Sequence, residues 1–146
     1  MRIQLHHTHI LASDIETTLQ FWQNMFGAQV LFDMEIAGAR NIMLAVGSGK
    51  INVYDQPPKQ GGGGAYHHLG IQTDDLDALI KHMKGKGFRF AGQIREHGYL
   101  RYIIAVAPDN ILLEIFQIST ETAPKAIQET LRRAFTFNSN IYPGDF

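Results

Sequence analysis

The sequence contains no cysteine and has no excess of charge of either sign. The absence of cysteine among 146 residues excludes disulfide bonds, zinc sites built on thiolates and catalysis by a thiol nucleophile. Lysine plus arginine number 13 and aspartate plus glutamate 14, which gives a formal net charge of -1. The chain thus has no excess of positive charge with which to bind nucleic acid or an anionic membrane surface, and we expect neither as a partner.

Long hydrophobic runs are also missing. The first residues, Met1 to His7, lack the apolar stretch of a signal peptide, and no later run approaches the roughly 18 apolar residues of a membrane span. We therefore expect no membrane segment and a cytoplasmic location. The length and a hydrophobic fraction of 45% are those of one ordinary globular domain that buries its core without disulfides.

What the sequence does contain is an internal repeat. A shift of 61 residues matches polar and apolar positions of the two halves, in the pairs His6-His7 with His67-His68, Ile10 with Ile71, and Asp14 with Asp75. Slips of one residue add two further pairs, Gly27 with Gly87 and Asn52 with Glu114. Self-similarity at a fixed period predicts two similar structural modules.

Each module has the pattern β-α-β-β-β. The first strands are expected at Ile3 to Leu11 and Tyr66 to Gln72. The first helix follows a capping box, Ser13-Asp14-Ile15-Glu16, and ends at Gly27, and the second runs from Asp74-Asp75 to Gly85 and Gly87. Turn residues then separate the remaining extended segments, which are Gln29 to Ile36, Arg40 to Val46, Lys50 to Tyr54, Arg89 to Ile94, Leu100 to Val106 and Ile111 to Ile118.

We expect residues 1–146 to form a single domain of the α+β class. Residues 1–57 are its first module, 58–65 a glycine-rich linker, and 66–118 its second module. No Gly-Lys-Ser or Gly-Lys-Thr follows the four consecutive glycines, which argues against a phosphate-binding loop. Residues 119–146 add a C-terminal helix and a tail, and the amphipathic stretch 119–137 has no counterpart in the first module.

Three residues at matched positions suggest a metal site. Strand alternation places His7 and His9 on one face, and the repeat places His68 at the position equivalent to His7. Glu114 is the only acid between Ile111 and Ile118, and a carboxylate in such an apolar strand requires a partner or a metal ion. Two imidazoles and one carboxylate suit Fe(II), Mn, Co, Ni or Zn. We predict that His7, His68 and Glu114 bind a divalent metal ion and that His9 assists proton transfer.

Simpler roles are open for the same residues. A strand histidine is often only an exposed or hydrogen-bonded polar residue. Glu114 is also suited to a cross-strand ion pair with Arg101 or Lys50. The recurrence of these residues at equal positions in both modules favours the metal site.

Residues 3 to 118 resemble the vicinal oxygen chelate superfamily, which includes glyoxalase I, methylmalonyl-CoA epimerase, extradiol dioxygenases and the fosfomycin and bleomycin resistance proteins. The resemblance is carried by ordered motifs in both modules, namely His7-Thr8-His9-Ile10-Leu11-Ala12-Ser13-Asp14-Ile15, Phe21-Trp22, Phe26-Gly27, His67-His68-Leu69-Gly70-Ile71, Asp75-Leu76 and Pro108-Asp109-Asn110-Ile111-Leu112-Leu113-Glu114. It implies two βαβββ modules that form a cup-shaped mixed β-sheet site. It also implies a metal ion held by His7, Asn52, His68 and Glu114, with Asn52 standing where glyoxalase I has a glutamate and the epimerase branch an amide.

The resemblance further implies a metal-dependent isomerase, epimerase or lyase that chelates adjacent oxygens of a small oxygenated substrate and moves a proton. The residue that removes the proton is then Glu114, His9 or Glu35. Glu35 aligns to within about one residue with a position at which the epimerase branch has an acidic residue. An Fe(II) extradiol dioxygenase is the first alternative, and a metal-independent protein that binds an antibiotic is the second, although that branch generally lacks the metal ligands. We also expect a homodimer, with the C-terminal helix strengthening its contact.

Overall fold

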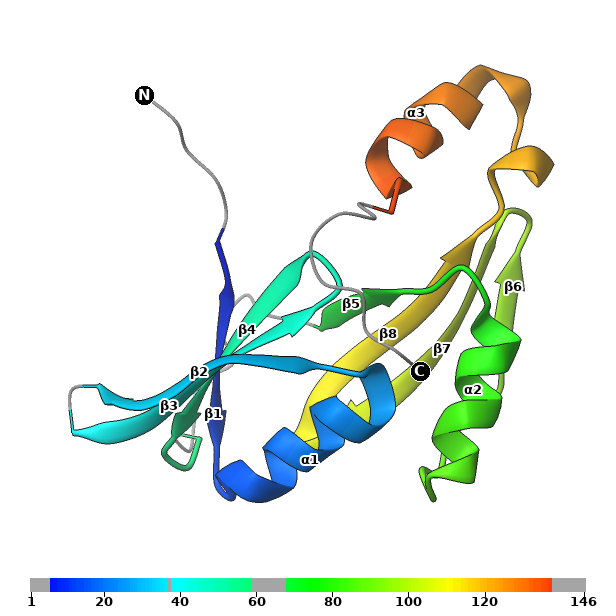
Figure 1. Ribbon diagram of the computed structural model, residues 1–146. Coiled ribbons are helices and arrows are strands. Elements are labelled where there is room, and N and C mark those ends of the chain that lie inside the picture. Colours follow the sequence, from blue (N-terminus) through cyan, green and yellow to red (C-terminus); the bar gives the residue numbers. More distant parts are fainter. Residues whose placement is uncertain (1–5, 37, 59–67, 138–146) are drawn as a thin grey trace, which may run out of the picture. The chain divides into compact units, whose positions relative to one another are not determined.

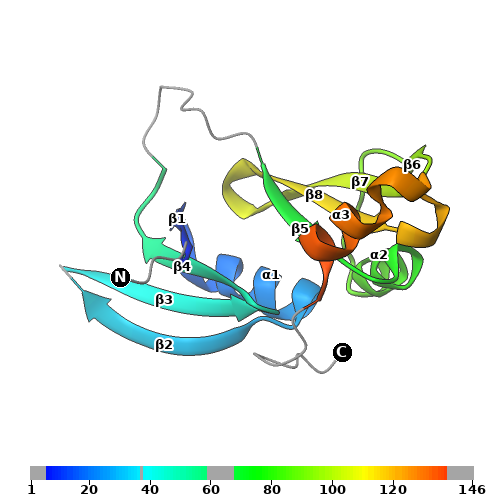
Figure 2. The same cartoon turned by 90° about the horizontal axis from the view of Figure 1, so that it is seen from above.

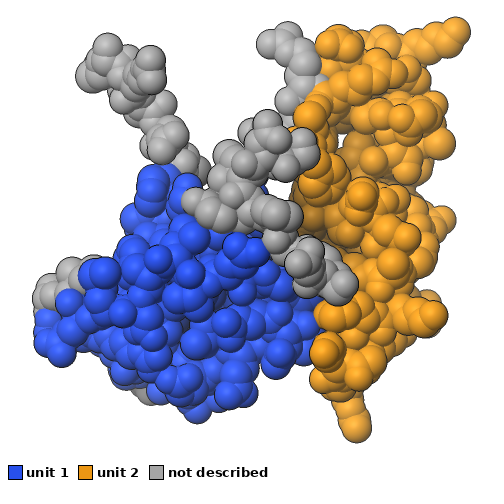
Figure 3. Space-filling view, in the orientation of Figure 1, with its two compact units in different colours: residues 1–63, 138–146 blue, residues 64–137 orange. Residues whose placement is uncertain are grey.

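The computed structural model describes residues 6–36, 38–58 and 68–137. The chain divides into two compact units, which Figure 3 shows in different colours. Unit 1 comprises Met1–Gly63 with Asn138–Phe146, and unit 2 comprises Gly64–Phe137. Most of the expected linker, and the first residues of both expected first strands, lie outside the described residues.

Unit 1 is a four-stranded mixed sheet with one helix on one face (Figure 1 and, from above, Figure 2). Its elements are β1 (Thr8–Ala12), α1 (Ile15–Phe26), β2 (Gln29–Ile36), β3 (Ala39–Val46) and β4 (Gly49–Asp55). The strand order is β1-β4-β3-β2, in which β1 and β4 are parallel and the other pairs antiparallel.

Helix α1 begins and ends at residues suited to those positions. Asp14 is the N-cap, because its side chain accepts a hydrogen bond of 3.0 Å from the amide of Thr17. The expected capping box with Ser13 at the cap is therefore displaced by one residue. Gly27 ends the helix in the left-handed conformation, with φ of 61°, which costs a glycine little. The apolar side of the helix, with Trp22 at 0% exposure, packs on β4.

Unit 2 repeats this arrangement. Its elements are β5 (Leu69–Gln72), α2 (Leu76–Gly85), β6 (Arg95–His97), β7 (Leu100–Ala107) and β8 (Ile111–Ile118), with a 3-10 turn at Pro108–Asn110. The strand order is β5-β8-β7-β6, and Asp75 caps α2 by accepting a hydrogen bond of 2.9 Å from the amide of Ala78. The predicted α+β class with two βαβββ modules is thus confirmed.

One predicted strand is wrong. Residues 89–94 are not a strand, and β6 comprises only the three residues that follow. The rings of Phe88 and Phe90 pack edge to face with centroids 4.8 Å apart. Phe90 of the predicted strand thus packs against Phe88, in a segment that lies outside the ladder of the sheet.

The C-terminal segment of unit 2 is helical, as expected, with Pro124 at the start of the helix. A 3-10 turn at Thr120–Thr122 precedes α3, which spans Lys125–Phe135. Figure 1 shows α3 apart from α2, and its last residue, Phe135, contacts Gln72 of β5 and Phe116 of β8. Among the described residues, no helix is both long and apolar enough to cross a membrane.

Candidate functional site

The ladder registers of the two units confirm how the internal repeat is aligned. In unit 1, His9 on β1 lies beside Asn52 on β4. In unit 2, Gly70 on β5 lies beside Glu114 on β8. Asn52 and Glu114 therefore occupy equivalent positions, as the one-residue slip in the repeat predicts.

The structure brings together two of the predicted metal ligands in unit 2. His68 Nε2 lies 3.4 Å from Glu114 Oε2, and the side chains are 33% and 28% exposed. Leu113 and Ile115 are buried on the face of β8 that packs on α2. Alternation along the strand places Glu114 on the opposite face, where its carboxylate is open to solvent and to a ligand.

The alternative ion pair between Glu114 and Arg101 is wrong. Arg101 lies on the α2 face, where its Nη1 is 2.8 Å from Asp77 Oδ2 and its Nε is 2.9 Å from Glu96 Oε1. The hydrogen bonds from Arg101 hold the pKa of Asp77 below its usual value. Glu114 and Arg101 therefore belong to different faces of the sheet.

Unit 1 contains the equivalent arginine cluster. Arg40 pairs with Glu16 of α1 and, at 2.6 Å, with Asp33 of β2, and these hydrogen bonds lower the pKa of Asp33. Glu16 precedes Arg40 by 24 residues, the same separation as between Asp77 and Arg101. Both arginines join the first turn of a helix to a neighbouring strand. These clusters were not predicted, although the shift of 61 residues relates Glu16 to Asp77 and Arg40 to Arg101.

The predicted first-strand histidines gather at the start of β1. His6 Nδ1 and His7 Nδ1 are 2.9 Å apart, which is a hydrogen bond when one nitrogen carries a proton and the other does not. The ring centroid of His9 lies 6.5 Å from that of His7 and 5.3 Å from that of Tyr54. His7 and His9 are exposed, so both imidazoles are accessible.

Asn52 has one amide atom without a protein partner. The residue is 8% exposed, and its Nδ2 donates a hydrogen bond of 3.2 Å to Asn41 Oδ1. Its Oδ1 is buried and has no hydrogen-bond partner among the residues that the structure describes. A buried unpaired carbonyl is costly, and a ligand or cation would satisfy it.

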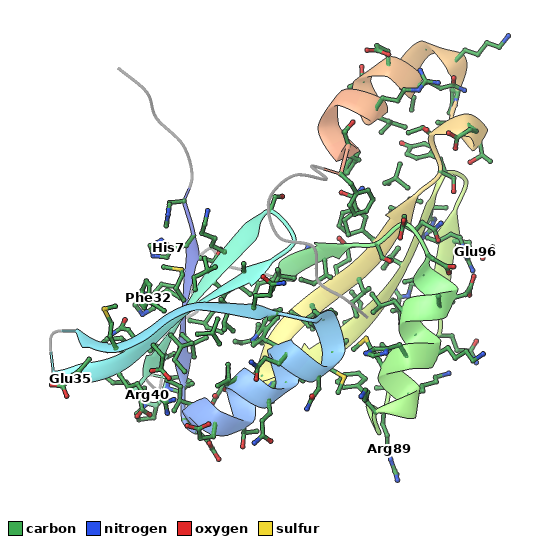
Figure 4. The ribbon with its side chains drawn as sticks, viewed as in Figure 1. His7, Phe32, Glu35, Arg40, Arg89 and Glu96 are labelled. Atoms are coloured by element: carbon green, nitrogen blue, oxygen red, sulfur yellow. The ribbon has the colours of Figure 1, made fainter. Side chains whose placement is uncertain are left out.

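Glu35 lies away from this group. Its ladder partner is Arg40, near the outer end of the β2–β3 hairpin, as Figure 4 shows. Because Asp33 and Glu35 alternate with Phe32 and Met34, Glu35 shares the α1 face of the sheet, whereas His9 and Asn52 occupy the other face. The structure thus does not bring Glu35 to the candidate ligands in unit 1.

No unit holds three candidate ligands by itself. Across residues 6–36, 38–58 and 68–137, no group of three or more histidine, aspartate or glutamate side chains lies close enough to hold a metal ion. The predicted set draws His7 from unit 1, and His68 and Glu114 from unit 2. Its role as one metal centre stays a prediction.

Two βαβββ units in one chain are the fold of the vicinal oxygen chelate class, and here the second unit places the imidazole of His68 beside the carboxylate of Glu114. The sequence model of the Glyoxalase/Bleomycin resistance protein/Dioxygenase superfamily matches residues 4–115, and the chain belongs to this superfamily. No curated relative matches the chain.

Solved structures of this superfamily share the fold at low identity. The fosfomycin resistance protein FosX from Listeria monocytogenes, complexed with Mn(II) and sulfate, is 20% identical, with a TM-score of 0.62 and coverage of 84% of this chain and 98% of that one. A mutant of the same protein with Mn(II) and 1S,2S-dihydroxypropylphosphonic acid is 21% identical, with a TM-score of 0.69 and coverage of 84% and 97%. FosX from Mesorhizobium loti is 16% identical, with a TM-score of 0.60 and coverage of 89% and 99%.

Proposed function

We propose that this protein is a divalent-metal-dependent enzyme that binds a small oxygenated substrate through adjacent oxygens and moves a proton on it, as an isomerase, epimerase or lyase. The observation that carries the proposal is the 3.4 Å approach of His68 Nε2 to Glu114 Oε2 on one sheet face. An imidazole nitrogen and a carboxylate oxygen at this separation are suited to bind one cation.

His7, His68 and Glu114 would hold the ion, and the unpaired Oδ1 of Asn52 is a candidate for a weak fourth ligand. Two neutral imidazoles and one carboxylate leave coordination positions open for oxygen atoms of a substrate. Such an ion, when bound, polarises those oxygens and stabilises the negative charge that develops as a proton leaves the adjacent carbon.

His9 is the residue that we assign to proton transfer. It is exposed on the same face as His7, and its ring packs against that of Tyr54, which limits the orientations of the imidazole. A neutral imidazole accepts a proton at one ring nitrogen and returns it from the same atom. Glu114 offers a second acceptor through the carboxylate oxygen that it does not use as a ligand, whereas Glu35 lies on the other sheet face and is left out.

The fosfomycin resistance proteins guide the choice of metal and substrate. Two structures of the Listeria monocytogenes protein contain Mn(II), and one of these also contains a dihydroxypropylphosphonic acid. Mn(II) is therefore the first metal to test, and a small phosphonate the first substrate. A phosphonate with a neighbouring oxygen also presents the adjacent oxygens that the proposal requires.

The decisive experiment measures metal content on protein purified without a histidine tag and offered Fe(II), Mn(II), Co(II), Ni(II) or Zn(II). We expect a stoichiometric ion in the wild type, its loss in His68→Ala and Glu114→Gln, and its retention in His82→Ala. His82 is a matched control because it lies on α2, which covers the opposite face of the sheet from Glu114. Retention of the ion in His68→Ala and Glu114→Gln would contradict the site.

Two further outcomes separate the alternative functions. Oxygen uptake with a catechol, seen only with Fe(II), would replace the isomerase proposal with a dioxygenase. Small-molecule binding that survives a chelator, in protein that takes up none of the five ions, would favour a metal-independent binding protein.

A further inference from the structure

The C-terminal helix of unit 2 reaches the sheet face that contains His68 and Glu114. Gln72 and Phe116 follow Gly70 and Glu114 by two residues on the paired strands β5 and β8, so all four positions share one face. Gln72 Nε2 donates a hydrogen bond of 2.7 Å to the carbonyl oxygen of Phe135, in the last turn of α3. The rings of Phe116 and Phe135 meet edge to face with centroids 5.9 Å apart.

The ring of Phe116 reaches Gly70, the ladder neighbour of Glu114. A Cβ atom on Gly70 would lie 3.4 Å from Cε1 of Phe116, which is van der Waals contact. Gly70 is itself the ladder partner of Glu114 and lies two residues after His68. The edge of the Phe116 ring therefore covers the strand backbone directly beside the two ligands.

The same backbone positions carry polar rings in unit 1. His9 corresponds to Gly70, and Tyr54 corresponds to Phe116, with the rings of His9 and Tyr54 5.3 Å apart. One copy of the repeat thus places proton-exchanging groups at these positions. The other copy places a glycine and an aromatic surface there, and α3 extends that surface with Phe135.

We propose that Phe116 and Phe135 form an apolar wall of the metal site and select substrates that carry an apolar substituent next to their chelating oxygens. This inference rests on the proposed function. The half-buried rings offer a substituent a flat apolar surface, and aromatic side chains gain most from such contacts. Gln72 holds the end of α3 in place, so the C-terminal helix is a specificity element of the site.

Two hydroxamic acids test the wall because they share one pair of adjacent oxygens and differ only in the attached group. Acetohydroxamic acid carries a methyl group and benzohydroxamic acid a phenyl group. The dissociation constant of each is measured by calorimetry on Mn(II)-loaded protein, after a direct titration of Mn(II). The ratio of the two constants cancels the intrinsic chelating strength of each probe when variants are compared.

We expect Phe135→Ala to reduce the preference for benzohydroxamic acid by about three- to tenfold, the range that an aromatic contact provides. The affinity for Mn(II) should stay at the wild-type value, because Phe135 is not a ligand. Phe137→Ala is the matched control, since Phe137 is 51% exposed just beyond α3, and it should leave the ratio unchanged. Phe135→Leu and Phe116→Leu keep the test valid if the alanine variant does not fold.

The outcomes distinguish this inference from the function on which it rests. Absence of Mn(II) binding in the wild type would refute both. Normal Mn(II) binding with an unchanged ratio in Phe135→Leu and Phe116→Leu would overturn the wall alone. An equal change of the ratio in Phe137→Ala would also overturn it, because the effect would then not depend on the ring beside Phe116.

Discussion

Two consecutive residues of β8 allow stability and metal binding to be separated. Leu113 is 0% exposed on the face that packs on α2, and Glu114 points to the opposite face beside His68. We predict that Leu113→Ala lowers stability and keeps the affinity for Mn(II). Glu114→Gln should do the reverse, because the amide has nearly the same shape as the carboxylate but lacks its charge.

The burial of each residue sets the expected magnitudes. Truncation of a buried leucine costs about 2–5 kcal/mol, and Leu113 has the small Ala105 as a ladder neighbour, which is unable to fill the cavity. The half-exposed pair of Glu114 with His68 contributes only about 0.2–1 kcal/mol. Loss of a group that merely orients a metal ligand lowers affinity by about 10–100-fold, and loss of the ligand itself should cost at least as much.

Urea unfolding followed by circular dichroism measures stability, and titration followed by electron paramagnetic resonance measures Mn(II) affinity. Glu129→Gln on α3 is the matched control for the removal of a carboxylate, and it should change neither quantity. Wild-type affinity in Glu114→Gln would refute its assignment as a ligand. A loss of several kcal/mol in Glu114→Gln would refute the assignment of the two residues to different faces.

Three further predictions concern acid, helix capping and metal removal. Arg101 lowers the pKa of Asp77 below 3.8, so its carboxylate stabilises the fold above that pH and ceases to do so as the pH falls through the lower folded value. Arg101→Gln should therefore weaken the dependence of the urea midpoint on pH below 4, and an unchanged acid profile would contradict this. Asp75→Ala should cost about 1 kcal/mol in urea unfolding, whereas Asp75→Asn should cost less, since asparagine also caps helices. Mn(II) at about 100 times its dissociation constant should stabilise the protein by about 2.7 kcal/mol until a chelator is added; an equal effect in His68→Ala would show that the ion binds elsewhere.

The internal repeat made most of the fold predictable. Asp14 and Asp75 lie 61 residues apart, and both cap a helix whose apolar face packs on its sheet. The two modules have the same caps, strands and turns in the same order. They therefore form the same strand pairing, because each helix has to cover the sheet that its own strands form. The match of Asn52 with Glu114 required a one-residue slip, which the ladder registers of both units contain.

The strand preceding β7 was not predictable in the same way. Alternation of side chains does not show whether aromatic residues pair in a ladder or pack on each other, and Phe88 and Phe90 do the latter. In β6, Glu96 instead pairs across the hairpin with Arg101, which also pairs with Asp77 of α2, 24 residues earlier in the chain. Such pairs depend on which residues the fold brings together, and a local pattern contains no information on that.

The wall residues were missed because they depend on contacts across the chain. Gln72 and Phe135 are 63 residues apart, and α3 has no counterpart in the first copy of the repeat. The one-residue slip that aligns Asn52 with Glu114 also aligns Tyr54 with Phe116. This second match would have indicated that Phe116 lies next to the site. It would not have shown that α3 returns to that position.

The two copies of the repeat use one backbone position for different chemistry. Asn52 is almost fully buried, and a carboxylate there would lose most of its hydration, whereas the amide keeps its bond to Asn41 and carries no charge. Glu114 is half-buried at the equivalent position, where ionisation costs less. A ligand set drawn from both copies therefore contains one carboxylate only. A divalent cation held by the proposed set would keep a net positive charge, which would favour the negatively charged oxygens that form when a substrate loses a proton.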